Sequence, residues 1–356
     1  MNLIPLIALA VGLGCSDKGS SDDTGATTVD TDTVADDGAI DDTAITGSPS
    51  GPGGDDTDTG TKTVPCEVAL EETEPEEGDV IFYRDPIELE FDGPGKGAVI
   101  SLINADTKAE VALSAPLWDN KDTTADVLPA EALTGDSNYT LSVTICDVTT
   151  EVNFSTSSFG SPLTKGPATL NDRTYVVELS EVTYTEPAGL GFVLAGTLTV
   201  PILVGVQAVY KDTIDLIGAE GVLANEGYYF QNPNLDSWDF SGASWEDPFF
   251  SIDAESVSIT YDDVEIPIFD FHLEGTFSPD GSAIGGGKLW GLGDTRNMSG
   301  FVASTDPAAI CDLLALSGVN CDPCPSDDEP YCLYLKAEEI EADQEPDLIV
   351  VPIVTD

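Results

Sequence analysis

The chain has 356 residues, of which 41% are hydrophobic, with 34 Gly and 23 Pro. This length and composition suit about two domains rich in turns and β structure. The 66 acidic and 12 basic residues give a formal net charge of -54 at pH 7. Such a surface repels phosphate backbones, which excludes nucleic acid as an expected partner. The charge either keeps the protein soluble in an ion-rich medium or serves a dedicated cation-binding function.

The N-terminus has the pattern of an export signal. Residues 3–13 form an uncharged apolar run, too short to span a bilayer as a helix but suited to the hydrophobic part of a signal peptide. The Gly-Leu-Gly-Cys sequence at 12–15 resembles the lipobox of bacterial lipoproteins, with Gly12 where that family usually has Leu. The resemblance implies cleavage of residues 1–14 and lipidation of Cys15, hence a lipid anchor in the membrane. It implies an outer-membrane lipoprotein, periplasmic or surface-exposed; the alternative is a buried N-terminal strand with a chance cysteine.

Residues 15–63 are predicted to be a disordered acidic tether. The segment consists almost wholly of Asp, Thr, Gly, Ser and Ala, and it contains no aromatic residue. It therefore lacks the apolar surface that would offset the entropy of folding, and its like charges favour an extended chain. The runs 30–32 and 55–58 have alternating Asp as in calcium loops, but the Gly spacing and closing Glu of such loops are absent. Calcium is the one cofactor considered, and otherwise none is expected.

Seven cysteines suggest a lipidated residue and a set of disulfides. Lipidation of Cys15 leaves an even number, and exported proteins normally oxidise such cysteines to disulfides. The simplest pairing joins the first two of the remaining residues and makes two bridges within the C-terminal group, although other pairings stay open. A single Cys-x-x-Cys spacing is not typical of structural zinc. The six predicted disulfide cysteines are Cys66, Cys146, Cys311, Cys321, Cys324 and Cys332.

Residues 65–158 are predicted to form an antiparallel β-sandwich. Apolar and polar residues alternate over 87–91 and 139–145, which is typical of half-buried strands. About seven such short strands, separated by turn residues, suit a sandwich. With Pro-Glu-Glu-Gly at 75–78 and Phe-Ser-Thr at 154–156, the segment resembles the bacterial Ig-like domain of S-layer and surface proteins. The resemblance implies a spacer or adhesion module without catalysis.

Residues 160–356 are predicted to be a disulfide-containing antiparallel β-barrel or curved sheet with one or two helices. Asp306, Pro307 and Gly318 bound an apolar segment that has the signals of a helix. Residues 187–210 carry no charge. We expect a buried helix that runs into a buried strand there, and the alternative is a lipid-facing or ligand-lining segment.

Few residues suggest chemistry. The chain has one histidine, which excludes metal motifs that need two, and it has neither a Gly-x-Ser-x-Gly elbow nor a phosphate-binding loop. On a strand, Asp270, His272 and Glu274 would share one face and could contribute to a metal or acid-base site. The alternative is a solvated polar face over a core of Phe and Leu. No catalytic or cofactor-binding residue is assigned.

The leading functional hypothesis is a lipid-anchored surface protein without catalytic activity. Its role would be structural, adhesive or binding, with a protein or a surface polymer as partner. The alternative is a carrier of an apolar ligand inside 160–356, in a cavity lined by 188–209. A secreted hydrolase is the third hypothesis.

Overall fold

The computed structural model describes residues 66–261 and 263–354. The predicted signal peptide, the lipidation site at Cys15, the acidic tether and both Asp-rich runs lie outside the described residues. Among the described residues, no helix is long and apolar enough to cross a membrane.

The first part of the fold is a pair of sheets that enclose a common core. One sheet has the strand order β1-β3-β7-β6 and the other the order β2-β9-β8-β4-β5. Strict alternation explains the core: Ile87, Leu89 and Phe91 of β3 are buried while the residues between them are exposed. The strands are β1 Leu70–Glu74, β2 Val80–Ile81, β3 Ile87–Phe91, β4 Val99–Asn104, β5 Glu110–Val111, β6 Leu117–Trp118, β7 Thr124–Val127, β8 Asn138–Ile145 and β9 Val148–Thr156.

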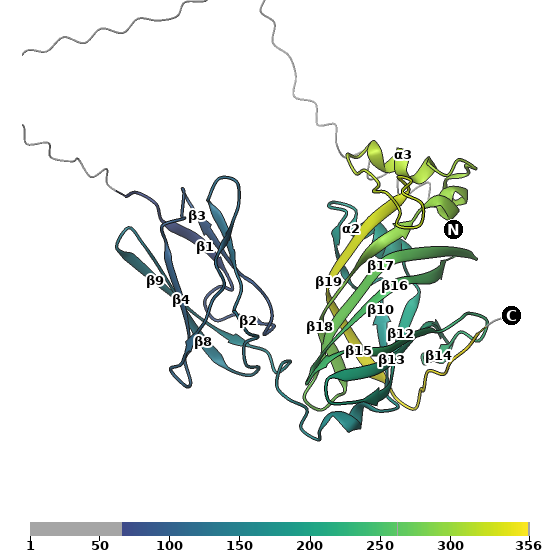
Figure 1. Cartoon of the computed structure of the whole chain (residues 1–356), viewed down its shortest axis with the longest axis horizontal. Helices are drawn as coiled ribbons and strands as arrows, with labels where there is room; N and C mark the ends of the chain where they lie inside the picture. Colours follow the sequence, from purple (N-terminus) through teal and green to yellow (C-terminus); the bar gives the residue numbers. More distant parts are fainter. Residues whose placement is uncertain (1–65, 262, 355–356) are drawn as a thin grey trace, which may run out of the picture. The chain divides into compact units, whose positions relative to one another are not determined.

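The second part is an antiparallel barrel (Figure 1). Eight strands follow in the order β10-β12-β13-β15-β16-β17-β18-β19, and pairing of β10 with β19 closes the circle. The predicted mainly-β fold class is thereby confirmed. The strands are β10 Thr174–Glu178, β11 Thr183–Glu186, β12 Pro201–Val209, β13 Thr213–Leu223, β14 Tyr229–Gln231, β15 Trp238–Glu246, β16 Phe249–Tyr261, β17 Val264–Phe277, β18 Ala283–Asp294 and β19 Cys332–Glu345.

Side chains fill the barrel interior. Phe277 is fully buried, and its ring centroid lies 5.2 Å from those of Tyr175 and Phe250 and 5.8 Å from that of Trp245. These aromatic rings occupy the space that an apolar ligand would need. The predicted ligand-carrying cavity is therefore replaced by packed core.

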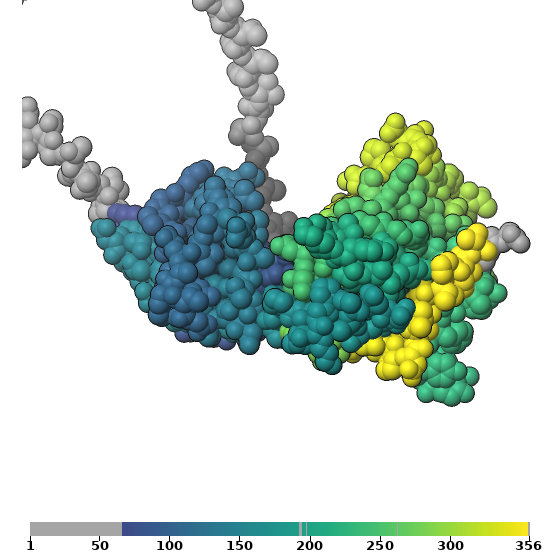
Figure 2. Space-filling model, turned by 60° about the horizontal axis from the view of Figure 1, so that its bottom comes forward, coloured from purple at the N-terminus to yellow at the C-terminus, as the bar shows by residue number. Residues whose placement is uncertain are grey.

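The uncharged segment spans a short helix and a central strand. The helix α2 covers Gly191–Thr197, and β12 covers Pro201–Val209 between β10 and β13. Leu203 and Val204 are buried on opposite faces of β12. Val204 enters the interior, whereas Leu203 is covered on the outside of the barrel by Val350 of the C-terminal segment. Figure 2 shows that segment in yellow along the barrel surface.

A disulfide-linked segment lies between β18 and β19. It contains the 3-10 helix η2, Arg296–Val302, and the helix α3, Ala309–Ala315; a further 3-10 helix, η1, Pro167–Leu170, precedes β10. Helix α3 is shorter than the sequence signals suggest. Disulfide bonds, expected from the cysteine count, are present here between Cys311 and Cys321 and between Cys324 and Cys332.

Candidate functional site

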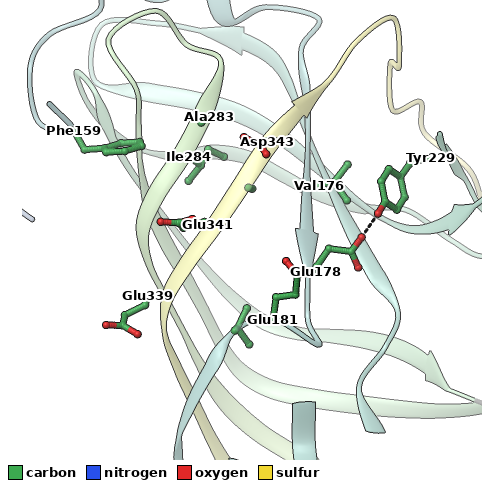
Figure 3. A pocket seen from close by; sticks show the side chains of 12 residues that line it. Phe159, Val176, Glu178, Glu181, Tyr229, Ala283, Ile284, Glu339, Glu341 and Asp343 are labelled. Carbon is green, nitrogen blue, oxygen red and sulfur yellow. Dashed lines mark hydrogen bonds between the residues drawn. The ribbon is translucent and has the colours of Figure 1, made fainter. Parts of the chain in front are cut away.

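An acidic pocket of about 440 Å³ opens on the outside of the barrel. Residues of β10, β14, β18 and β19 line it, together with Phe159 from the segment before the barrel (Figure 3). Apolar contacts come from Val176, Val182, Ala283, Ile284 and Ala342. Its five carboxylates belong to Glu178, Glu181, Glu339, Glu341 and Asp343.

The pairing of β10 with β19 places these acids on one face. Val176 lies opposite Asp343, and Val177 lies opposite Ala342. Because side chains alternate along a strand, Val177 and Ala342 point into the core while Glu178 and Asp343 point outward. The first and last strands of the barrel thus bring together acids that lie far apart in the sequence.

A bulge in β19 adds another acid to this face. Ala337 and Ile340 are both buried, although two residues separate them instead of one. Glu339 takes the extra position, with a φ of 55° in the left-handed region. It is exposed and lines the pocket beside Glu341.

Tyr229 and Glu178 form the central polar contact of the pocket. The Tyr229 hydroxyl donates a hydrogen bond to Oε1 of Glu178, shown as a dashed line in Figure 3. This hydrogen bond raises the pKa of Tyr229 to about 12, with smaller contributions from burial and from the charges of Glu178, Glu181 and Glu345. The phenol therefore keeps its proton at neutral pH and holds the Glu178 carboxylate in a fixed orientation.

The charge of the pocket is not balanced by its own walls. None of the residues that line it is Lys, Arg or His. Within 66–261 and 263–354, no three His, Cys, Asp or Glu side chains converge closely enough to hold a metal ion. The pocket can instead surround an organic cation, because its carboxylates are spread over β10, the segment that follows it and β19, around an apolar wall.

The predicted polar face around His272 is only partly assembled. Its Nε2 lies 3.2 Å from Oε2 of Glu274, and its Nδ1 lies 2.7 Å from Oδ1 of Asp253 on β16. The ring also stacks on Trp290, with centroids 3.7 Å apart. Asp270 has a φ of 47° at an irregularity in the pairing of β17 with β18, which breaks the alternation that the prediction assumed. Sequence reasoning missed Asp253, whose position opposite His272 depends on strand register.

The described cysteines are committed to disulfides. In addition to the two bridges between β18 and β19, Cys66 and Cys146 are each disulfide-bonded. None of these six residues therefore offers a free thiolate as a nucleophile. Disulfides persist in oxidising compartments, which places this chain outside the cytoplasm.

Comparisons with known proteins return solved structures only. No family model matches the chain, and no curated protein matches it. Similar solved structures include L,D-transpeptidase 3 from Mycobacterium tuberculosis, at 13% identity and a TM-score of 0.22, covering 46% of this chain and 81% of that one. An L,D-transpeptidase from Mycobacterium smegmatis shares 14% identity at a TM-score of 0.21, covering 46% and 79%. Another from Mycobacterium tuberculosis H37Rv shares 12% identity at 0.21, with the same coverage.

These neighbours correct the functional prediction. All three are named as enzymes, which contradicts the prediction of a surface protein with a structural, adhesive or binding role and no catalytic activity. The alternative prediction, a carrier of an apolar ligand, is also wrong, because side chains fill the barrel interior. At these TM-scores, the likeness assigns no residue role to this chain.

Proposed function

We propose that this chain is an outer-membrane lipoprotein whose barrel recognises an amine-bearing cation in the acidic pocket. The observation that carries the proposal is the set of five carboxylates around one pocket with no basic residue in its lining. The lipobox-like sequence before Cys15 supports the anchor, and the disulfides agree with the compartment.

The arrangement of the pocket favours an elongated cation. Ammonium groups would lie near the carboxylates of Glu178 and Glu341, and methylene groups would pack on Val176 and Ile284. The hydroxyl of Tyr229 fixes the Glu178 carboxylate before the cation arrives, so less entropy is lost on binding. Exposed charge pairs contribute up to about 1 kcal/mol each, so several together give a dissociation constant of about 1 mM.

Calorimetric titration with 1,5-diaminopentane tests the pocket, with uncharged 1,5-pentanediol as the matched ligand. We expect the diamine to bind and the diol to give no heat of binding. The Glu339→Gln/Glu341→Gln variant should weaken the diamine about tenfold. The matched control is Glu90→Gln/Glu151→Gln, which removes the same charge from exposed strand positions outside the pocket. Equal weakening by both variants would show that net charge alone attracts the diamine and would refute the pocket.

The anchor is tested separately. Metabolic labelling with a fatty acid should mark the wild-type protein and fail to mark a Cys15→Ser variant. Intact-mass analysis should find residues 1–14 removed and the lipid attached to Cys15. A mature protein that retains residues 1–14 would refute the anchor and leave the pocket proposal unaffected.

A further inference from the structure

The barrel wall is paired over only a short distance between β15 and β16. Their pairing consists of Ser244 with Ser251, Trp245 with Phe250 and Glu246 with Phe249. Beyond these pairs β16 continues to its end beside β17, while β15 remains paired with β13. Figure 1 shows the β16–β17 hairpin extending past β15. The two strands therefore separate and leave two strand edges with a gap between them.

The gap is a groove of about 790 Å³. Its two sides are residues 239–244 of β15 and 251–256 of β16, and residues 212–213 form one end. Phe240 and Ile252 are buried, so the groove has an apolar floor that separates it from the barrel interior. It is distinct from the acidic pocket between β10 and β19.

A side-chain carboxylate takes the place of a missing strand near the end of β16. On β15, by contrast, the N–H of Ser241 donates to Asp239 of the same strand and the N–H of Gly242 donates to Asp215 of the paired strand β13. On β16, the N–H of Thr260 donates to Oε1 of Glu220, a side chain that is only 5% exposed. Burying a carboxylate has a free-energy cost, so its use here shows that the edge of β16 requires an acceptor that β15 does not supply.

The two edges differ in regularity. Along the groove β15 is bulged, with Gly242 at a φ of 78° and its N–H donated to Asp215 of β13, whereas β16 keeps a continuous register with β17. In a strand, N–H groups two residues apart point to the same edge, so the N–H of Ser258 faces the same side as that of Thr260. An added strand would therefore pair with β16.

The lining of the groove carries negative charge. Asp212, Asp239, Asp253 and Glu255 line it together with four serines, and no Lys or Arg is among the lining residues. Lys211 is paired with Asp212 and His272 contacts Asp253, whereas neither Asp239 nor Glu255 forms an ion pair with a basic side chain of the described residues. Charge complementarity therefore selects a basic occupant.

We propose that the gap between β15 and β16 is a docking slot for an extended basic peptide segment that adds a strand to the edge of β16. Main-chain hydrogen bonds to β16 would supply the affinity, and Lys or Arg side chains near Asp239 and Glu255 would select the sequence. The occupant is an extended segment of another protein rich in Lys or Arg.

Hydrogen–deuterium exchange with a short Lys-Val repeat peptide tests the slot. Binding should slow exchange of the amides of residues 252–258, and a peptide N-methylated at alternate residues should bind at least tenfold more weakly, because it loses hydrogen bonds worth about 1 kcal/mol each. The Glu-Val peptide should not bind. The Glu255→Gln variant should weaken the Lys-Val peptide severalfold, with Glu151→Gln as the charge-matched control.

Three results would overturn the slot. The first is absence of binding by the Lys-Val peptide at low salt. The second is equal affinity for the N-methylated peptide, which would mean that charge alone holds the peptide. The third is protection confined to amides outside 252–258. The peptide comparisons use the wild-type chain, so a variant that misfolds does not affect them. None of the three results depends on diamine binding in the acidic pocket.

Discussion

The sandwich and the barrel differ in how regularly their strands alternate. In β8 of the sandwich, every second residue from Tyr139 to Ile145 is buried, without interruption. In the barrel, bulges and left-handed residues interrupt the alternation, as at Gly242 beside the groove and Glu339 in the acidic pocket. The regular strands do little beyond enclosing a core, whereas the irregular ones place carboxylates together on the outside. Departures from the simple β pattern therefore mark the surfaces that carry the proposed functions.

The largest expected effect concerns the barrel core. Replacing Phe277 by Ala should lower the free energy of unfolding by about 3–5 kcal/mol, because the removed ring is fully buried among Tyr175, Trp245 and Phe250. Urea denaturation measures the loss. Tyr228→Ala, at a side chain that is 51% exposed, is the control and should change the stability little. A loss below about 1 kcal/mol for Phe277→Ala would mean that the interior is not packed as described.

The next effect appears at high pH. Burial raises the pKa of Tyr175 to about 12, and its hydroxyl donates to the Gly281 carbonyl at 2.6 Å. An unfolded tyrosine loses its proton near pH 10. The contribution of Tyr175 to the free energy of unfolding is therefore fully present below pH 10 and decreases as the pH rises toward 12, by about 3 kcal/mol in all. In the Tyr175→Phe variant, the melting temperature should decrease less between pH 10 and pH 12 than it does in the wild type. An unchanged slope in the variant would contradict this role of Tyr175.

A smaller effect is expected from the bridge between Cys324 and Cys332. Its loop is short, with a sequence separation of 8, so the chain-entropy model gives a contribution of about 2.5 kcal/mol. The Cys324→Ser/Cys332→Ser variant should lower the melting temperature of the barrel by an amount that corresponds to this loss of free energy. The sandwich contains neither of these cysteines. Its melting temperature, followed through Trp118, should therefore stay unchanged.

The smallest effect concerns the turn between β17 and β18. Hydrogen bonds from Ser282 and Ser278 lower the pKa of Asp280 to about 2. The stabilisation is present above the unfolded pKa of 3.8 and is lost as the pH falls toward 2. Asp280→Asn should therefore flatten the acid side of the stability curve with little change at pH 7. If the variant and the wild type have the same stability at every acidic pH, Asp280 does not contribute to the loss of stability in acid.

The sequence predicts where the strands lie better than it predicts which strands and side chains come into contact. Alternating residues in 87–91 and 139–145 correspond to β3 and β8, because a half-buried strand requires that period. The acidic pocket was not predicted, since Glu178 and Tyr229 are 51 residues apart and meet only once the barrel is built. Asp253 and His272 meet through the register of β16 and β17, which no local pattern specifies.

Closure of the barrel by β10 and β19 has a consequence for how the protein reaches its native state. The strand that begins at Thr174 cannot complete its hydrogen bonds until residues up to Glu345 are available. If the chain crosses the membrane from its N-terminus, the barrel must wait open until almost the whole polypeptide has arrived. A product truncated before β19 would keep the pairing of β10 with β12 but leave the other edge of β10 open, and such an edge favours aggregation.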